Sequence, residues 1–338
     1  MCIRDRSRTY LAAGTYQISI KGNAWPGAIW SASQNKLNRI TKLLSWGNTG
    51  IYDLSYAFSG STALVQATPP DVIKFSANGT GLIRNCFQNC VNLTTASIAG
   101  TDTSAITNAS GVYAREVFSG CTSLETLDVQ NITIGDNPGV YTVTTAIYRF
   151  AAYVGTNVTD GTEINFSNIT FANSVPANEY GTHQFFYSSR IKSSIADNWN
   201  FTGHSGNINL DSVLYNVVFP TTNKTAYFRN WTFNSNSNID ITQFAYAGQF
   251  DEIDFSGNTE IMYINRSYQT LQNSQVQRIK GLDKWKSATT MKTSGLQRIF
   301  RNATFMTFST TDSQYNFLSL IHISEPTDRT RSRMPSSA

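Results

Sequence analysis

Six acidic residues are the side chains of this sequence best suited to acid–base chemistry. They are Asp128, Asp160, Glu163, Asp251, Glu252 and Asp254. Cleavage of a polysaccharide needs a carboxylate pair as acid and base, or carboxylates that hold calcium beside a basic residue. Asp251, Glu252 and Asp254 form the densest cluster, and Glu252 and Asp254 would point to one side of a strand. The others follow no recognisable catalytic spacing, so we favour a solvated acidic patch over an active site.

The histidines give no sign of nucleophilic catalysis. His183 and His204 have no serine or cysteine nucleophile motif beside them. A catalytic Ser-His-Asp or Cys-His site needs a serine or cysteine nucleophile that the histidine activates, so the sequence predicts no such site. We therefore expect a protein without catalytic activity, and nothing in the sequence calls for a cofactor.

Both ends of the sequence resemble translated sequencing-adapter DNA rather than the chain between them. Residues 1–5 correspond to one reading frame of a transposase mosaic end, and 318–327 with 332–338 correspond to the reverse element and its adapter. We expect 1–6 and 318–338 to be adapter-derived and to make few core contacts. These ends carry five arginines against three acidic residues, so the net charge of +4 becomes +2 without them. That balance gives no reason to expect a nucleic-acid partner.

The composition favours an extracellular location. Charged residues make up 14% of the chain, whereas Asn, Ser, Thr and Gly are abundant. This is more typical of a secreted, cell-surface or virion β-protein than of a cytosolic enzyme. No apolar run is long enough to span a bilayer, so we expect no membrane insertion in this fragment.

A spaced apolar pattern recurs along the chain and predicts a solenoid. In 116–129 the apolar residues are spaced by three, three, three and two, which indicates a tight bend followed by a strand. The same spacing recurs at 87–98 and 244–255. The first apolar residues, or anchors, are Phe58, Phe87, Phe118, Phe150, Phe186, Leu214, Phe244, Leu271 and Phe300. Their intervals of 27–36 residues predict about nine irregular repeats.

The cysteines fit this repeat better than they fit a metal site. Without Cys2, three remain, which argues against a disulfide framework. Cys90 and Cys121 occupy one repeat position, where Ser61 stands in another repeat, so we interpret them as small buried residues. Cys86 and Cys90 have no second pair or nearby histidine, so no metal site is predicted.

Each repeat is expected to end in a short strand of a stacked parallel sheet. In Leu127-Asp128-Val129 the apolar residues would face the core and the polar one would face out, and 164–166 and 253–255 repeat this pattern. Polar side chains of successive coils would then form one exposed stripe. We predict ligand binding on this stripe at Thr126, Asp128, Asn165, Glu252 and Asp254.

The chain divides into a cap and a solenoid. Tyr16, Ile18 and Ile20 alternate with polar residues, which indicates a strand. A solenoid needs an atypical terminal unit over the open end of its core, and Trp25 and Trp30 could supply it. We therefore assign 7–39 to an N-terminal β cap and 40–317 to a solenoid truncated at its C-terminus.

The repeats resemble a known family. Phe118-Ser-Gly-Cys-Thr-Ser-Leu124, followed by Leu127 and Val129, is similar to the leucine-rich repeats of BspA-like (Treponema pallidum type) surface proteins. The resemblance is firmest over 40–129, although the family's repeats are shorter. It implies a mainly β, leucine-rich-repeat solenoid that serves in adhesion at a cell surface without catalysis. The partner would be a host or environmental glycan or a surface protein.

Two other functions stay open. Residues 165–171 and 230–233 also resemble coils of right-handed β-helix lyases and hydrolases that degrade polysaccharides. Repeats and Asn/Thr-rich β-architectures of this kind also occur in phage tails and fibres, where the function would again be attachment.

Overall fold

The computed structural model describes most of the predicted solenoid. The described ranges are 39–47, 53–75, 83–102, 114–134, 147–171, 180–203, 207–220, 224–235, 237–258 and 262–281, with residues 17, 51, 260, 285–287, 298 and 301. The adapter-like ends, the anchor Phe300, His204 and, apart from residues 17 and 39, the predicted cap lie outside the described residues.

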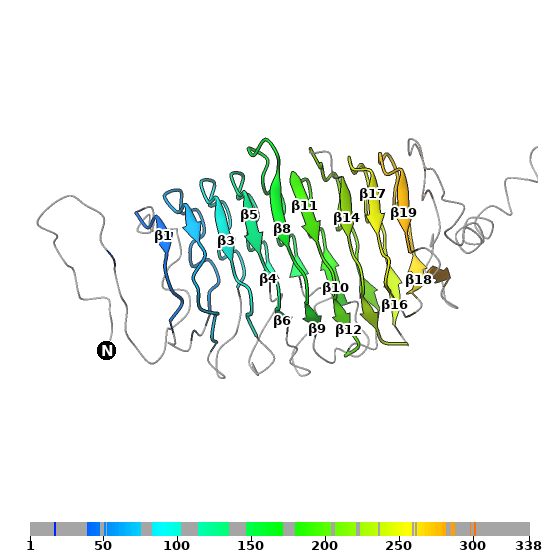
Figure 1. Cartoon of the computed structure of the whole chain (residues 1–338), viewed down its shortest axis with the longest axis horizontal. Helices are drawn as coiled ribbons and strands as arrows, with labels where there is room; N and C mark the ends of the chain where they lie inside the picture. Colours follow the sequence, from blue (N-terminus) through cyan, green and yellow to red (C-terminus); the bar gives the residue numbers. More distant parts are fainter. Residues whose placement is uncertain are drawn as a thin grey trace, which may run out of the picture.

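The described chain forms three parallel sheets that run along one long axis (Figure 1). The nine-stranded sheet contains, in spatial order, β1 (Lys42–Leu43), β2 (Gln66–Ala67), β3 (Thr95–Ser97), β5 (Thr126–Asp128), β8 (Thr162–Asn165), β11 (Ile191–Ile195), β14 (Thr225–Tyr227), β17 (Glu252–Asp254) and β19 (Arg278–Lys280). The seven-stranded sheet contains β4 (Ala114–Arg115), β7 (Ile147–Tyr148), β10 (Tyr180–His183), β13 (Ile208–Asn209), β16 (Asn238–Asp240), β18 (Met262–Arg266) and β20 (Trp285–Ser287). The four-stranded sheet contains β6 (Thr133–Ile134), β9 (Thr170–Phe171), β12 (Asn200–Phe201) and β15 (Thr232–Phe233).

The chain visits the sheets in a fixed order, which confirms the predicted solenoid and its parallel sheet. Through β7–β15 each coil supplies one strand to the seven-stranded sheet, then one to the nine-stranded sheet, then one to the four-stranded sheet. Strands of successive coils pair in parallel, so each coil stacks on its neighbour (Figure 1). Among the described residues no helix is long and apolar enough to cross a membrane.

Stacked turns carry the predicted anchors into the core. The amide of an anchor donates to a carbonyl of the next coil, as from Phe58 to Cys86 at 2.8 Å and from Phe87 to Val117 at 2.8 Å. The rings of Phe58, Phe87 and Phe118 consequently stack at 5.3 and 5.1 Å. The anchors at Phe186, Leu214 and Leu271 follow the same hydrogen-bond register.

Two predicted anchors, Phe150 and Phe244, are wrong by one residue. The amide of Phe118 donates to the carbonyl of Phe150, which places Ala151, not Phe150, in the anchor column. The same register places Ala245 in the column. The phenylalanine before each alanine is still buried. Phe150 meets the edge of Phe118 at 5.5 Å, so it fills space that the alanine leaves.

Aromatic rings also stack beneath the four-stranded sheet. Phe171, Phe201 and Phe233 form one row, with ring centroids 4.3 and 5.6 Å apart. Trp199 and Trp231 form a second row at 4.7 Å, and both are buried. Each indole N–H donates to a carbonyl of the preceding coil at 2.6 Å, which satisfies the polar atom of each buried ring.

Asparagines form a third row at the corner before that sheet. Asn131, Asn168, Asn198 and Asn230 all have φ near +58°. The side-chain amides of Asn168, Asn198 and Asn230 each donate to the asparagine of the preceding coil, at 2.9, 2.8 and 3.2 Å. Asparagine suits this position because it tolerates the left-handed conformation and bonds to its own kind in the next coil. These residues therefore hold the coils together.

The three cysteines of the described chain are buried free thiols, as the repeat pattern predicts for Cys90 and Cys121. Cys90 donates to the carbonyl of Phe58 at 3.0 Å, and Cys121 donates to that of Phe87 at 3.1 Å. Ser61, Cys90 and Cys121 share one register position. The thiols therefore serve as small core residues that bond to the neighbouring coil.

We expect all three thiols to resist alkylation in the native protein. Burial raises the pKa of Cys90 to about 12 and also raises the pKa values of Cys86 and Cys121, so the reactive thiolate is scarce at neutral pH. Peptide mass spectrometry after iodoacetamide treatment should find the three unmodified in native buffer and modified in denaturant. Native modification at Cys90 would contradict the assigned packing.

Candidate functional site

The residues of the predicted stripe lie on the nine-stranded sheet, where they form two separate rows of paired residues across the strands. Thr126 pairs with Glu163, and Asp128 pairs with Asn165. The row of paired residues that contains Thr126 and Glu163 continues along the sheet to Glu252. The row that contains Asp128 and Asn165 reaches Asp254 only through Ile195 and Tyr227, so it is not polar throughout. The five predicted residues therefore share a sheet without forming one continuous polar row.

Several of these residues close the corner that follows their own strand. A carboxylate oxygen of Asp128 accepts the amide of Gln130 at 3.3 Å, and Asn165 accepts that of Ser167 at 3.3 Å. Asp254 accepts the amide of Ser256 at 2.8 Å. Asp and Asn favour such turns because their side chains bond to the backbone two residues on. The repeated polar residue thus has a structural reason that is independent of a ligand.

Glu252 and Asp254 are not freely exposed acceptors. Their exposed fractions are 4% and 5%. Glu252 forms ion pairs with Arg278 and, at 2.9 Å, with Lys280 of the next coil. Its hydrogen bond to Lys280 raises the pKa of that ammonium group. Because a buried carboxylate needs such partners, this pair of cations explains why Glu252 is tolerated there.

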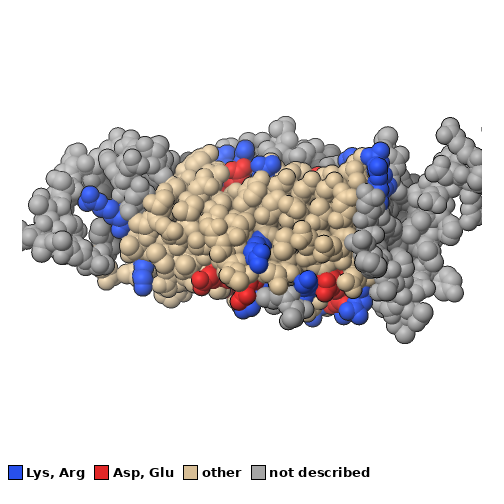
Figure 2. All heavy atoms as spheres, turned by 90° about the horizontal axis from the view of Figure 1, so that it is seen from above, with Lys and Arg blue, Asp and Glu red and all other residues tan. Residues whose placement is uncertain are grey.

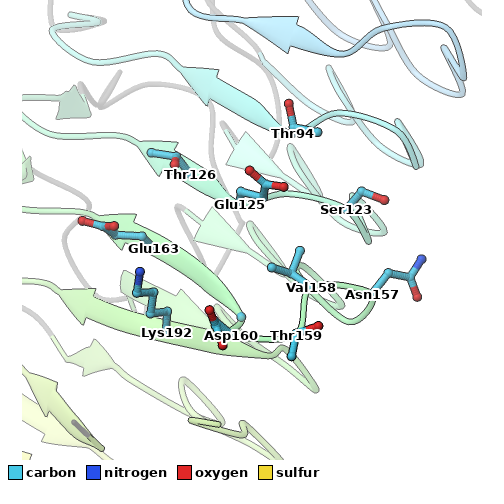
Figure 3. A pocket seen from close by; sticks show the side chains of 11 residues that line it. Thr94, Ser123, Glu125, Thr126, Asn157, Val158, Thr159, Asp160, Glu163 and Lys192 are labelled. Atoms are coloured by element: carbon cyan, nitrogen blue, oxygen red, sulfur yellow. The ribbon is translucent and has the colours of Figure 1, made fainter. Parts of the chain in front are cut away.

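A polar groove of about 600 Å³ lies over the middle strands of the same sheet (Figure 3). It is lined by Thr94, Ser123, Glu125, Thr126, Asn157, Val158, Thr159, Asp160, Gly161, Glu163 and Lys192. Its floor comes from the start of β3, β5, β8 and β11, and one wall is the loop 155–161 that precedes β8. Thr126 is the predicted stripe residue that lines it.

Hydrogen bonds to both neighbouring coils hold the wall of the groove in place. Arg190 of the next coil donates to the carbonyl of Thr159 through Nε at 3.1 Å and Nη2 at 2.7 Å. The side chain of Asn157 donates to Thr122 of the preceding coil at 3.0 Å, and its backbone amide bonds to the same residue at 2.9 Å. The loop is therefore held from both neighbouring coils, and the groove is largely preformed.

Gly161 lets this loop return to the sheet. Its φ is +78°, and a Cβ at this position would lie 2.8 Å from backbone atoms of Ile191 and Lys192. Both the conformation and the close approach exclude a side chain. The wall thus depends on a glycine at the point where it meets β8.

The groove brings together charges that the sequence separates. Asp160 and Glu163 were predicted as candidate carboxylates, whereas Glu125 and Lys192 were not recognised. Figure 3 shows Glu163 and Asp160 on either side of the Lys192 side chain, with Glu125 beside Thr126. Hydroxyls, an amide, carboxylates and an ammonium group together can accept and donate hydrogen bonds, as recognition of a hydroxyl-rich ligand requires.

The other candidate carboxylates, and the histidine of the described residues, lie elsewhere. Asp251 precedes β17, in the part of the sheet that contains Glu252 and Asp254. His183 ends β10 of the seven-stranded sheet, where its Nδ1 is 3.1 Å from Asp211. No group of three or more His, Cys, Asp or Glu residues suited to a metal ion occurs in the described ranges.

Comparisons with known proteins identify no relative. No family model, no curated protein and no solved structure matches the chain. The resemblance to BspA-like repeats therefore stays a prediction, and the function is argued from the site.

Proposed function

We propose that this protein is a non-catalytic binding protein that takes up a glycan in the groove lined by Glu125, Thr126, Asp160, Glu163 and Lys192. The observation that carries the proposal is the preformed wall 155–161 beside a floor of polar side chains. Preorganisation reduces the entropy lost when a ligand binds. The resemblance to adhesion proteins supports the same function.

The chemistry of the lining favours a glycan over a protein partner. Thr94, Ser123, Thr126 and Thr159 contribute hydroxyls, and Val158 is the one aliphatic side chain in the lining. A protein hot spot usually needs an aromatic or aliphatic anchor in a desolvated pocket, which this groove does not offer. Sugar hydroxyls can form hydrogen bonds with the hydroxyl, carboxylate and ammonium groups of the lining. We expect the affinity of each groove for a glycan to be modest.

The setting proposed for this activity is a bacterial cell surface or a virion. A composition poor in charge and rich in Asn, Ser and Thr supports it, as do the repeats. Attachment through many weak contacts is effective there, because several copies act together.

A polysaccharide-degrading enzyme is the second candidate function. It is favoured by the gathering of three carboxylates, Glu125, Asp160 and Glu163, in one groove. An acid and a base on neighbouring strands are what glycosidic cleavage requires. Incubation with a bound glycan separates the two candidates: the binding protein returns it intact, whereas the enzyme releases shorter products that mass spectrometry detects.

A glycan array tests the proposal. We expect the wild-type chain to bind a subset of glycans, and a variant with Glu125→Gln, Asp160→Asn and Glu163→Gln to lose binding by about tenfold or more, since each charged hydrogen bond contributes about 1.5–3 kcal/mol. Asp128→Asn, which removes a carboxylate from the same sheet outside the groove, should leave binding unchanged. If the triple variant and Asp128→Asn, each shown to be folded, changed glycan binding equally, the assignment of the groove as the binding site would be contradicted.

A further inference from the structure

The groove concentrates charge on a chain that carries little of it. Four of its eleven lining residues are charged, Glu125, Asp160, Glu163 and Lys192, whereas charged residues make up 14% of the chain. Figure 2 shows a broad face of the coils on which most side chains are uncharged. All four charged side chains of the groove are exposed, so they are accessible to a ligand.

Backbone contacts fix where the carboxylates of the groove stand. The amide of Glu163 donates to the carbonyl of Glu125 at 2.8 Å, so these two residues lie on adjacent coils in the floor. Asp160 belongs to the wall, where the amide of Gly161 donates to the carbonyl of Val158 at 3.1 Å. Figure 3 shows the three carboxylates at separate positions around the groove. A ligand therefore meets negative groups of both the floor and the wall.

The charge of the lining is negative on balance. Three carboxylates and one ammonium group give three negative charges against one positive charge. Arg190 adds one further positive charge at the wall, where its guanidinium donates to the carbonyl of Thr159. The balance stays negative even when Arg190 is included. The groove should therefore attract a cationic ligand and repel an anionic one.

The arrangement of the carboxylates favours several separate cationic groups over one metal ion. Within the described residues no three acidic, histidine or cysteine side chains converge as a metal ion requires. The chain itself places an ammonium group among the carboxylates, because Lys192 lies between Glu163 and Asp160 in Figure 3. Ammonium groups of a ligand would find partners of the same kind.

We infer that the groove selects glycans built from amino sugars with free, protonated amines and discriminates against acidic glycans. This inference rests on the proposed function and names its substrate class. The hydroxyls of Thr94, Ser123, Thr126 and Thr159 suit the sugar hydroxyls. Carboxylates bind ammonium groups through charge-assisted hydrogen bonds, which are stronger than neutral ones. The residues that line the groove include no aromatic ring on which a neutral sugar could stack, so charge provides the main discrimination.

Isothermal titration calorimetry of the full chain with three oligosaccharides of equal length tests the inference. A glucosamine tetramer is cationic, the N-acetylglucosamine tetramer has the same linkages without charge, and a galacturonic acid tetramer is anionic. At about pH 5.5, where the sugar amines are protonated, we expect the glucosamine tetramer to bind at least about tenfold more tightly than the N-acetylated one. The galacturonic acid tetramer should bind most weakly, and high salt should reduce these differences.

Two variants should change the affinity for the glucosamine tetramer in opposite directions. Glu163→Gln removes a negative charge and should weaken binding by about threefold or more, whereas Lys192→Gln removes a competing ammonium group and should strengthen binding by a similar factor. A loss of fold would weaken binding in both. Asp251→Asn is the matched control, because Asp251 lies at β17 of the same sheet, three strand spacings of about 4.8 Å from β8 and beyond the Debye length. It should leave binding unchanged.

The outcomes separate this inference from the proposed function. If the N-acetylated or the galacturonic acid tetramer binds at least as tightly as the glucosamine tetramer, the inference is overturned, although the groove is still a glycan site. If Lys192→Gln weakens binding as Glu163→Gln does, charge does not select the ligand, which also overturns it. Tighter binding of tetralysine than of the glucosamine tetramer would assign the groove to a basic peptide. Failure to bind any glycan on the array would contradict the proposed function and this inference together.

Discussion

Replacement of Phe118 by alanine should lower the free energy of unfolding by about 3–5 kcal/mol. The side chain is fully buried, stacks on Phe87 at 5.1 Å and meets the edge of Phe150 at 5.5 Å. Its removal leaves a cavity that the hydrogen-bonded turns on both sides cannot close. Denaturant unfolding followed by circular dichroism measures the loss.

Asp128→Ala on the adjacent strand is the control for Phe118. This residue is half-exposed and its hydrogen bonds to Gln130 are long, at 3.3 Å, so the change should stay near 0.5 kcal/mol. A loss as large as that of Phe118→Ala would mean that the register of core and surface residues is wrong.

Replacement of Trp199 by alanine should have an effect of similar size, about 3–5 kcal/mol. The indole is buried, stacks on Trp231 at 4.7 Å and meets Phe166 at 5.2 Å. The substitution also removes the hydrogen bond to the carbonyl of Phe166, a buried acceptor that then loses this donor.

Trp199→Phe separates the two contributions. It retains an aromatic ring in the row but removes the indole donor, so it should cost less than the alanine variant. If both variants unfold at the same denaturant concentration, the hydrogen bond rather than the stacked ring dominates, contrary to our expectation.

The fold was predictable because the repeat encodes one coil. Three-residue steps ending in alternation, as in 116–129, indicate a turn followed by a strand, and recurrence of the pattern implies stacking. The sequence could not reveal that Ala151 and Ala245 occupy the anchor column, because a large residue is expected at a core position. Only the hydrogen bonds between coils fix which of two adjacent residues stacks on Phe118.

The site was predictable in part. The expected polar stripe lies on the sheet that carries the proposed groove and shares Thr126 with it, but it also included Glu252 and Asp254, which ion pairs and turn hydrogen bonds account for. Glu125 and Lys192 were missed, since they meet only where β5, β8 and β11 stack. A signal for the groove was present: the interval from Phe150 to Phe186 is the longest of the chain and contains the loop 155–161.

The most direct test of the central claim is hydrogen–deuterium exchange with and without a glycan selected on the array. The ligand should slow exchange in 155–163 and at the start of β11, where the wall and floor of the groove lie. Slower exchange confined to another part of the chain, with 155–163 unchanged at saturating ligand, would contradict the assignment of the groove as the binding site.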